Sequence, residues 1–152
     1  MATHRYETRL RWTGSTGVGW EDYDREHSVT APPAEQEVRL TTGESKGDQA
    51  TLNPEQLLVM SASSCQMLSF LHVAAKSRID VVEYEDDATG FMPDDAKPLR
   101  ITEVTLRPRI VIEGEADEER VRNLVRIAHD HCFIANSLKS DMTIEPDIEI
   151  RA

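Results

Sequence analysis

The segment from Leu57 to Ala75 constrains the fold more than any other part of the chain, because its residues are apolar or small on nearly every side. A helix that is apolar all round has to be buried on most of its faces. Asn53 can cap a helix N-terminus, Pro54 suits the first helical position, and Glu55 puts an anion in the first turn. We therefore predict a long helix that begins at Pro54 and forms the centre of the core.

The chain before this helix has the pattern of strands. Apolar and polar residues alternate over residues 6–12, and short extended runs follow at residues 27–30 and 37–40. The stretch 41–50 is polar, contains two glycines and has no hydrophobic period, so it is predicted to be a loop.

The chain after the helix predicts a hairpin, a second helix and a last strand. Residues 81–91 and 101–112 form the hairpin, with one interruption at Pro108. Asp117 caps a helix with one apolar face that ends near Cys132, and residues 144–150 alternate as a strand. Strands, helix, two strands, helix and strand, with no long linker between them, predict a single α+β domain over residues 1–152.

Composition limits the partners and the compartment of this chain. With 28 acidic and 17 basic residues, the formal charge of −11 would repel a phosphate backbone, so we expect no nucleic acid partner. The first seven residues lack the apolar core of a signal peptide, and no apolar run is long enough for a bilayer, so we expect a cytoplasmic protein that does not bind membranes. Thiols stay reduced there, which favours a catalytic over a structural role for cysteine pairs.

The chain has two cysteines, Cys65 on the apolar helix and Cys132 after the second helix. Cys65 could be a buried thiol that acts as a small hydrophobe, or a reactive one. Because it lies in mid-helix, a reactive Cys65 needs a cationic side chain from another segment, and an arginine suits that role. His129 and His131 precede Cys132, but His-x-His-Cys directs its side chains to diverging faces, so we expect no metal.

Glu55 precedes Cys65 by ten residues, which on a continuous helix is a rise of about 15 Å. This is too far for one shared site. Either the helix bends, or Glu55 acts on the cysteine of another chain, as it would if two such helices packed antiparallel across a dimer axis. A simple role as a partner of the helix dipole is the remaining alternative.

Two motifs together resemble the OsmC/Ohr family of thiol-dependent peroxidases. The first is Asn53-Pro54-Glu55-Gln56-Leu57-Leu58 with Cys65 ten residues after the glutamate, and the second is Cys132 followed by Asn136-Ser137-Leu138. The Trp12-Thr13-Gly14 turn and the order of elements agree with the resemblance over nearly the whole chain. It implies an OsmC-like fold: an intertwined homodimer with two central helices enclosed by antiparallel sheets and active sites at the interface.

The resemblance also implies a reaction, the reduction of organic hydroperoxides. Cys65 would be the peroxidatic thiolate and become a sulfenic acid, and Cys132 would resolve it as an intramolecular disulfide. A dithiol, in the family often a lipoyl group on a partner protein, would restore both thiols. We expect no cofactor.

An arginine positioned by the glutamate completes the site that the resemblance implies. In the Ohr branch it commonly follows the glycines after the first strand, where this chain has Ser15-Thr16-Gly17-Val18. Arg25 is the nearest candidate and our first choice, and Arg39 is the second. Glu55 would hold whichever arginine enters the site.

A second departure from the family pattern concerns the residues around Cys65, which is preceded by Ser63-Ser64 and followed by Gln66-Met67. An apolar lining for an organic tail is available from Met60, Met67, Leu68, Phe70 and Phe133. The competing hypothesis is a dimeric OsmC-fold protein that binds an apolar small molecule without catalysis. Retention of both cysteines and of Glu55 favours the peroxidase, since a pure binder needs none of them.

Overall fold

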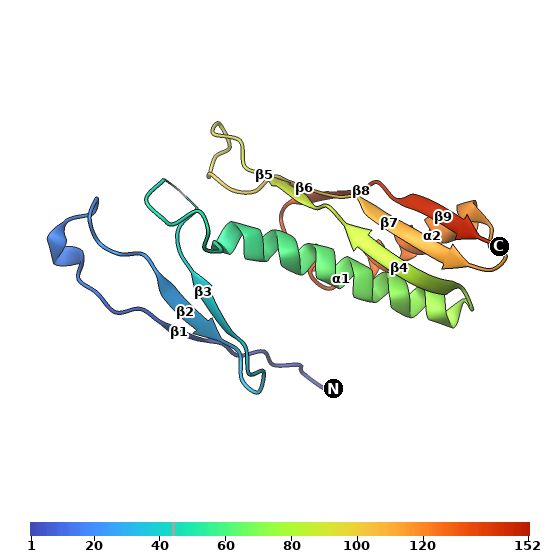
Figure 1. Cartoon of the computed structure of the whole chain (residues 1–152), viewed down its shortest axis with the longest axis horizontal. Coiled ribbons are helices and arrows are strands. Elements are labelled where there is room, and N and C mark those ends of the chain that lie inside the picture. Colours follow the sequence, from blue (N-terminus) through green and yellow to red (C-terminus); the bar gives the residue numbers. More distant parts are fainter. Residues whose placement is uncertain (44) are drawn as a thin grey trace. The chain divides into compact units, whose positions relative to one another are not determined.

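The computed structural model describes residues 1–43 and 45–152, which form two compact units, 1–57 and 58–152. Figure 1 shows their elements in order along the chain. The α+β class predicted from the sequence is confirmed. Whether the units behave as one domain stays a prediction.

The first unit is an antiparallel three-stranded sheet followed by the start of the long helix. Strands β1 (Arg9–Arg11), β2 (His27–Thr30) and β3 (Glu37–Leu40) are paired in the order β1-β2-β3, and the short helix η1 (Thr16–Val18) lies between the first two. The first strand is shorter than predicted. Of the predicted loop 41–50, Glu44 lies outside the described residues. Among the described residues of this unit, the sheet buries only Leu40 and its neighbour Thr41.

The long helix α1 (Pro54–Lys76) begins where the sequence predicts. Asn53 Oδ1 accepts a hydrogen bond from the N–H of Gln56 (2.8 Å), and Gln56 Oε1 accepts one from the N–H of Asn53 (3.1 Å). This reciprocal capping satisfies two backbone donors at the helix start. The cap thus has a second member, Gln56, beyond the asparagine that the sequence pattern identified.

The expected burial of α1 on most faces is not found within the chain. Only one stripe of the helix is fully covered, at Ala62, Gln66, Phe70 and Ala74, which are spaced four residues apart. Met60 and Leu68 are 51% and 61% exposed. The apolar character of α1 therefore exceeds what one chain can bury.

The length and composition of α1 also correct an expectation. With a mean hydropathy of 1.5 it is long and apolar enough to cross a membrane, although the sequence was expected to contain no such run. A single helix of this kind does not establish a membrane span, because the core helix of a globular protein meets the same criteria.

The second unit contains two three-stranded sheets, residues 58–76 of α1 and the helix α2 (Glu118–Asp130). Strand β4 (Asp80–Asp86) pairs with β7 (Pro108–Glu113), and β5 (Thr89–Phe91) pairs with β6 (Glu103–Leu106), both antiparallel, so the predicted long hairpin is confirmed with a bend in each arm. Gly90 lies so close to α1 that a Cβ there would be 2.7 Å from Val59 Cγ2, so a larger residue would have to displace the Val59 side chain.

The end of the chain differs from the prediction. Two strands, β8 (Asp141–Ile144) and β9 (Asp147–Arg151), replace the single strand expected at residues 144–150, and they are separated by Glu145-Pro146. Strand β8 joins β6 and β9 joins β7, each in parallel, because α2 carries the chain back to the same end of the sheets. Each sheet of this unit thus combines one antiparallel and one parallel pair of strands.

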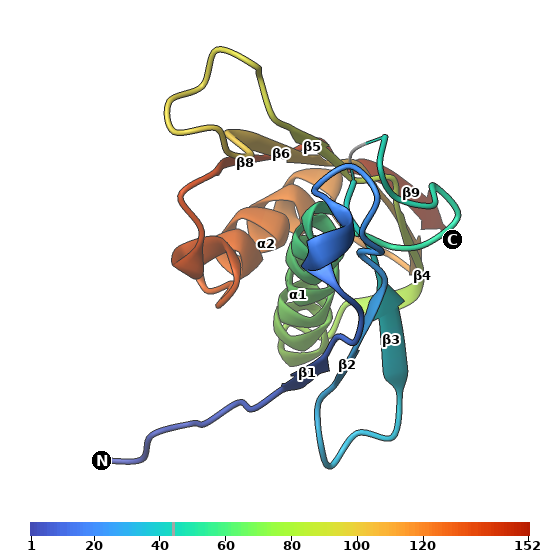
Figure 2. The ribbon, with the colours of Figure 1, turned by 90° about the vertical axis from the view of Figure 1, so that its left-hand side faces the viewer.

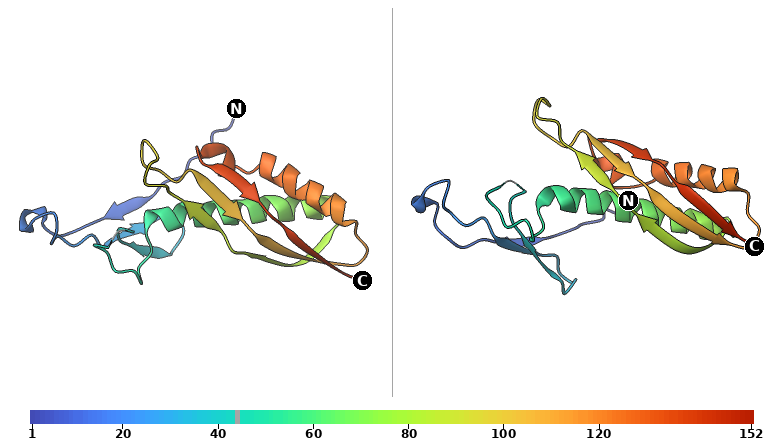
Figure 3. Two further views of the ribbon diagram at one scale, coloured as in Figure 1. Left: turned by 90° about the horizontal axis from the view of Figure 1, so that it is seen from above. Right: turned by 45° about the horizontal axis from the view of Figure 1, so that its top comes forward.

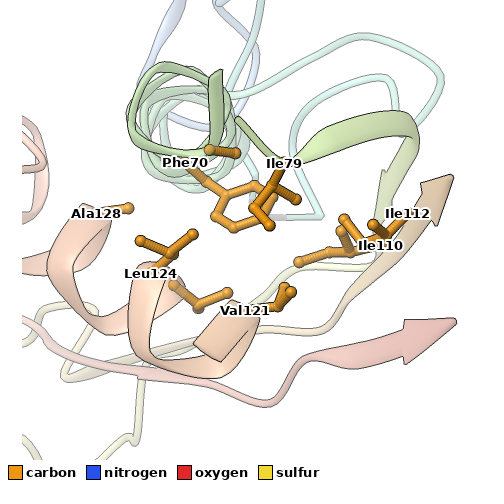
Figure 4. Close-up of a cluster of buried hydrophobic side chains, with 9 residues drawn as sticks. Phe70, Ile79, Ile110, Ile112, Val121, Leu124 and Ala128 are labelled. Carbon is orange, nitrogen blue, oxygen red and sulfur yellow. The ribbon is translucent and has the colours of Figure 1, made fainter. Parts of the chain in front are cut away.

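The main core of the second unit lies between α1, α2 and β7. Seen along α1, α2 lies beside it (Figure 2), and the strands β4, β7 and β9 run side by side along both helices (Figure 3). Phe70 from α1 points toward side chains of α2 and of β7 (Figure 4), and Tyr84 packs against its ring with centroids 6.0 Å apart. Members of this cluster include Phe70, Ala74, Ile79, Ile110, Ile112, Val121, Leu124, Val125 and Ala128.

Substitution of Phe70 should test how much this cluster contributes to the free energy of unfolding. We expect Phe70→Ala to lower the free energy of unfolding by about 3–5 kcal/mol, because the ring is fully buried and leaves a cavity. The measurement is urea unfolding followed by circular dichroism. Phe133→Ala is the matched control, since Phe133 is 78% exposed and should change stability little. Equal losses in the two variants would contradict the assigned core.

An exposed ion-pair network joins the three strands of the β4-β7-β9 sheet. Arg109 contacts Glu83 (2.9 Å) and Glu149 (2.6 Å), and Arg151 contacts the same two carboxylates at 3.3 and 2.7 Å. Hydrogen bonds from Arg109 and then Arg151 lower the pKa of Glu83, and hydrogen bonds from Arg151 and then Arg109 lower the pKa of Glu149.

Because of this network, the free energy of unfolding should depend on pH in the acidic range. A carboxylate with a lowered folded-state pKa stabilises the fold fully above its unfolded pKa of about 4.3, and that contribution is lost as pH falls through the folded value. We expect Glu83→Gln to destabilise the protein near neutral pH, and the difference from the parent chain to shrink as pH falls below about 4. Urea midpoints at several pH values would measure it. Glu115→Gln, which removes an exposed carboxylate outside the network, should show no such trend.

Candidate functional site

The two cysteines are in contact in the second unit, although Cys132 follows Cys65 by 67 residues in the sequence. Cys65 lies on α1 and is partly exposed, whereas Cys132 is fully buried just beyond the end of α2. Both thiols are free, and Cys65 lies close enough to raise the pKa of Cys132. The packing of α1 against α2 brings them together, so the structure places side by side the two residues that the resemblance pairs.

Three influences act on the Cys132 thiol. Burial raises the pKa of Cys132 and is the largest influence, while the N–H groups of Ala135 and Ile134 lower it by hydrogen bonding to the sulfur. The hydrogen bond to Cys65 and the charge of Cys65 raise the pKa of Cys132 further. Cys132 therefore keeps its proton near neutral pH, while the amides of Ala135 and Ile134 favour a thiolate once it forms.

The side chain of an asparagine stabilises the turn that contains Cys132. Asn136 Nδ2 donates to the carbonyl oxygens of Asp130 and Cys132, at 3.0 Å each, and the N–H of Asn136 donates to the Cys132 carbonyl at 3.0 Å. These contacts satisfy acceptors at the C-terminal end of α2, which the helix itself cannot satisfy. Asn136 belongs to the motif that begins at Cys132, but the sequence does not predict that its side chain stabilises this turn.

Glu55 and Arg25 lie in the first unit, whereas both cysteines lie in the second. The helix α1 runs from Pro54 to Lys76 as one element, so Glu55 and Cys65 are about 15 Å apart along its axis. Glu55 belongs to the capped first turn, and a Cβ on Gly43 would be 3.3 Å from its Oε2.

Arg25 is bound to its own loop. Its guanidinium lies 3.8 Å from the centroid of the Tyr23 ring and donates to the carbonyls of Tyr23 (2.8 Å) and Trp20. Trp12 packs edge-on against the same tyrosine and donates from Nε1 to the Asp24 carbonyl at 2.8 Å. Arg39, the second candidate, forms an ion pair with Glu26. The role of either arginine in the site stays a prediction.

The residues expected to line an apolar pocket have different positions. Phe70 is in the core and is not available to a ligand, and Leu68 and Phe133 are exposed. Met60 and Met67 line a cleft of about 630 Å³ between α1 and the β4–β5 bend. Ser63 and Met67 are each two residues from Cys65, or about 200° round the helix, so Cys65 points away from this cleft.

Tyr84 lines the same cleft, and its hydroxyl oxygen is buried without a hydrogen-bond partner among the described residues. Burial raises the pKa of Tyr84 well above its usual value, and the charges of Asp86 and Cys132 add to the effect. Tyr84 therefore remains a neutral phenol near the cysteine pair. Over residues 1–43 and 45–152, no group of three or more histidine, cysteine or acidic side chains is arranged to hold a metal ion.

The environment of Cys132 should be visible in a variant with one thiol. In Cys65→Ala we expect Cys132 to titrate above the value of about 8.5 for a free cysteine, because burial is the largest single influence on the pKa of Cys132. Thiolate absorbance measured against pH would show it. The same variant in concentrated urea is the control and should titrate near the ordinary value; a folded-state pKa at or below that value would contradict the assigned burial.

Comparison with known proteins gives a family and a fold. The model of the family described as OsmC-like protein matches residues 46–147. An OsmC-like protein of unknown function from Vibrio cholerae O1 biovar eltor is 27% identical, with a TM-score of 0.84 over 95% of this chain and 100% of the other. A comparison with curated proteins finds no match.

Two more distant structures carry functional names. An organic hydroperoxide resistance protein OsmC from Legionella pneumophila is 16% identical, with a TM-score of 0.67 over 98% of this chain and 99% of the other. The organic hydroperoxide resistance protein OhrB of Bacillus subtilis is 19% identical, with a TM-score of 0.63 over 97% of this chain and 100% of the other. At these identities the likeness shows the shared fold.

Proposed function

The chain belongs to the OsmC-like protein family, and from that premise we propose that it is a cysteine-based peroxidase that reduces organic hydroperoxides to alcohols. The observation that carries the proposal is the contact between a partly exposed Cys65 and a buried, protonated Cys132. One thiol is open to a substrate and the other is held where it can close a disulfide. The names of the Legionella and Bacillus proteins of the same fold support the choice of substrate class.

The reaction proceeds in three two-electron steps. The Cys65 thiolate attacks the distal oxygen of the hydroperoxide, the O–O bond breaks, and the alkoxide leaves and takes a proton to become the alcohol. Cys65 is then a sulfenic acid. The Cys132 thiolate attacks its sulfur, the S–S bond forms, the S–O bond breaks, and the oxygen leaves as water after protonation. A dithiol, which we propose to be a lipoyl group on a partner protein, then reduces the disulfide and is itself oxidised.

The active assembly in this proposal is a cytoplasmic homodimer. The first unit buries very little of its own sheet among its described residues, and α1 leaves large apolar side chains such as Met60 and Leu68 exposed. Pairing of two chains would cover both surfaces. It would also bring Glu55 of one chain, with Arg25, to Cys65 of the other, where a guanidinium would hold the thiolate and polarise the peroxide.

Substitution of each cysteine should separate their roles. We expect Cys65→Ser to consume tert-butyl hydroperoxide no faster than buffer, because the nucleophile is lost. Cys132→Ser should consume one peroxide per subunit and then stop, with a sulfenic acid on Cys65 that dimedone labels. Stopped-flow measurement of peroxide, followed by mass spectrometry, gives both results.

The parent chain is the control and should form a Cys65–Cys132 disulfide under the same conditions. Full activity in Cys65→Ser would refute the mechanism. Consumption by the parent chain no faster than that of a free thiol would refute the peroxidase and favour the alternative, a protein that binds an apolar small molecule.

A further inference from the structure

Gln66 is a polar side chain in the middle of an apolar interface. It is fully buried on the stripe of α1 that also contains Ala62, Phe70 and Ala74. Burial of an amide costs free energy unless its hydrogen bonds are replaced, and a leucine or methionine would fill a similar volume without that cost. Such a residue in a core calls for a specific explanation.

The amide of Gln66 connects the two helices. Its Nε2 donates to the backbone carbonyl of Val125 on α2 at 3.2 Å, and this hydrogen bond is buried. Its Oε1 is buried and has no partner among the described residues. The orientation of the amide is determined, because the Val125 carbonyl can only accept and so requires the NH₂ group. Gln66 thus makes one directional contact and leaves an acceptor unsatisfied.

This contact joins the elements that carry the two cysteines. Gln66 directly follows Cys65 on α1, and Val125 precedes Cys132 by seven residues, about two helical turns. The N–H of Cys132 donates to the carbonyl of His129 at 3.1 Å, so the Cys132 turn is attached to the same helix. A shift of α2 along α1 would therefore move Cys132 relative to Cys65.

We propose that Gln66 is a positioning residue for the Cys65–Cys132 disulfide. Apolar contacts between two helices have little directionality and tolerate small displacements, whereas a hydrogen bond fixes one point of α2 against one point of α1. A disulfide demands that kind of precision, because its geometry allows a narrow range of separations. This inference rests on the proposed function only in requiring that the two thiols form a disulfide.

The test replaces the amide by an apolar side chain of similar size and measures disulfide formation without peroxide. Purified Gln66→Met, Gln66→Leu and the parent chain are equilibrated in mixtures of reduced and oxidised dithiothreitol, and the disulfide is quantified by thiol labelling and mass spectrometry. Thr105→Val is the matched control, because Thr105 is also a buried polar residue but lies on β6. Urea unfolding of the reduced proteins is measured alongside.

We expect the equilibrium constant for the Cys65–Cys132 disulfide to fall about tenfold or more in both Gln66 variants, because the thiols are no longer held in register. The stability of the reduced variants should stay the same or rise, because an unsatisfied buried acceptor is removed. Thr105→Val should leave the disulfide constant unchanged. A merely structural role would lower stability and the disulfide constant together.

A disulfide constant within twofold of the parent in either folded Gln66 variant would overturn the proposal, as would an equal loss in Thr105→Val. The two apolar variants guard against a folding defect peculiar to one side chain. Because no peroxide is used, failure of the peroxidase proposal leaves this result interpretable: the disulfide equilibrium would still respond to Gln66 if the residue positions the pair.

Discussion

The packing of one stripe of α1 against α2 and β7 is the constraint on which the second unit depends. Phe70 is the largest fully buried side chain in that interface, where α1 and α2 pack against the β4-β7-β9 sheet. The same interface brings Cys132 to Cys65. The core and the candidate site are therefore two consequences of one helix pairing, which explains why a residue of the core stripe, Gln66, can influence the chemistry of its neighbour.

Local signals in the sequence were sufficient to predict the start of each helix and the long hairpin. Asn53 and Asp117 have side chains that cap a helix, and both do so. The last strand was mispredicted because alternation continues through Glu145-Pro146, while the parallel pairing with β6 and β7 requires a break there. The burial of α1 was overestimated because composition records how much apolar surface a helix has, and not whether one chain can cover it.

The sequence identified candidate site residues only where they belong to a recognisable motif. The resemblance paired Cys65 with Cys132, whereas no spacing rule relates residues so far apart in the chain. Glu55 and Arg25 lie in the first unit, and their part in the site stays a prediction. Gln66 departs from the family pattern, but its proposed role depends on the position of the Val125 carbonyl, which lies 59 residues away in the sequence.

The difference in burial between the two thiols distinguishes the proposed nucleophile from the proposed resolving thiol. In the proposed peroxidase the nucleophile has to meet a substrate from outside, and Cys65 is the partly exposed thiol, whereas Cys132 is fully buried. Burial keeps Cys132 protonated while Cys65 is reduced, and the amides of Ala135 and Ile134 favour its thiolate once that proton is given up. An exchange of the two roles would require the buried sulfur to admit the peroxide, and with it the opening of the interface between α1 and α2 that holds the unit together.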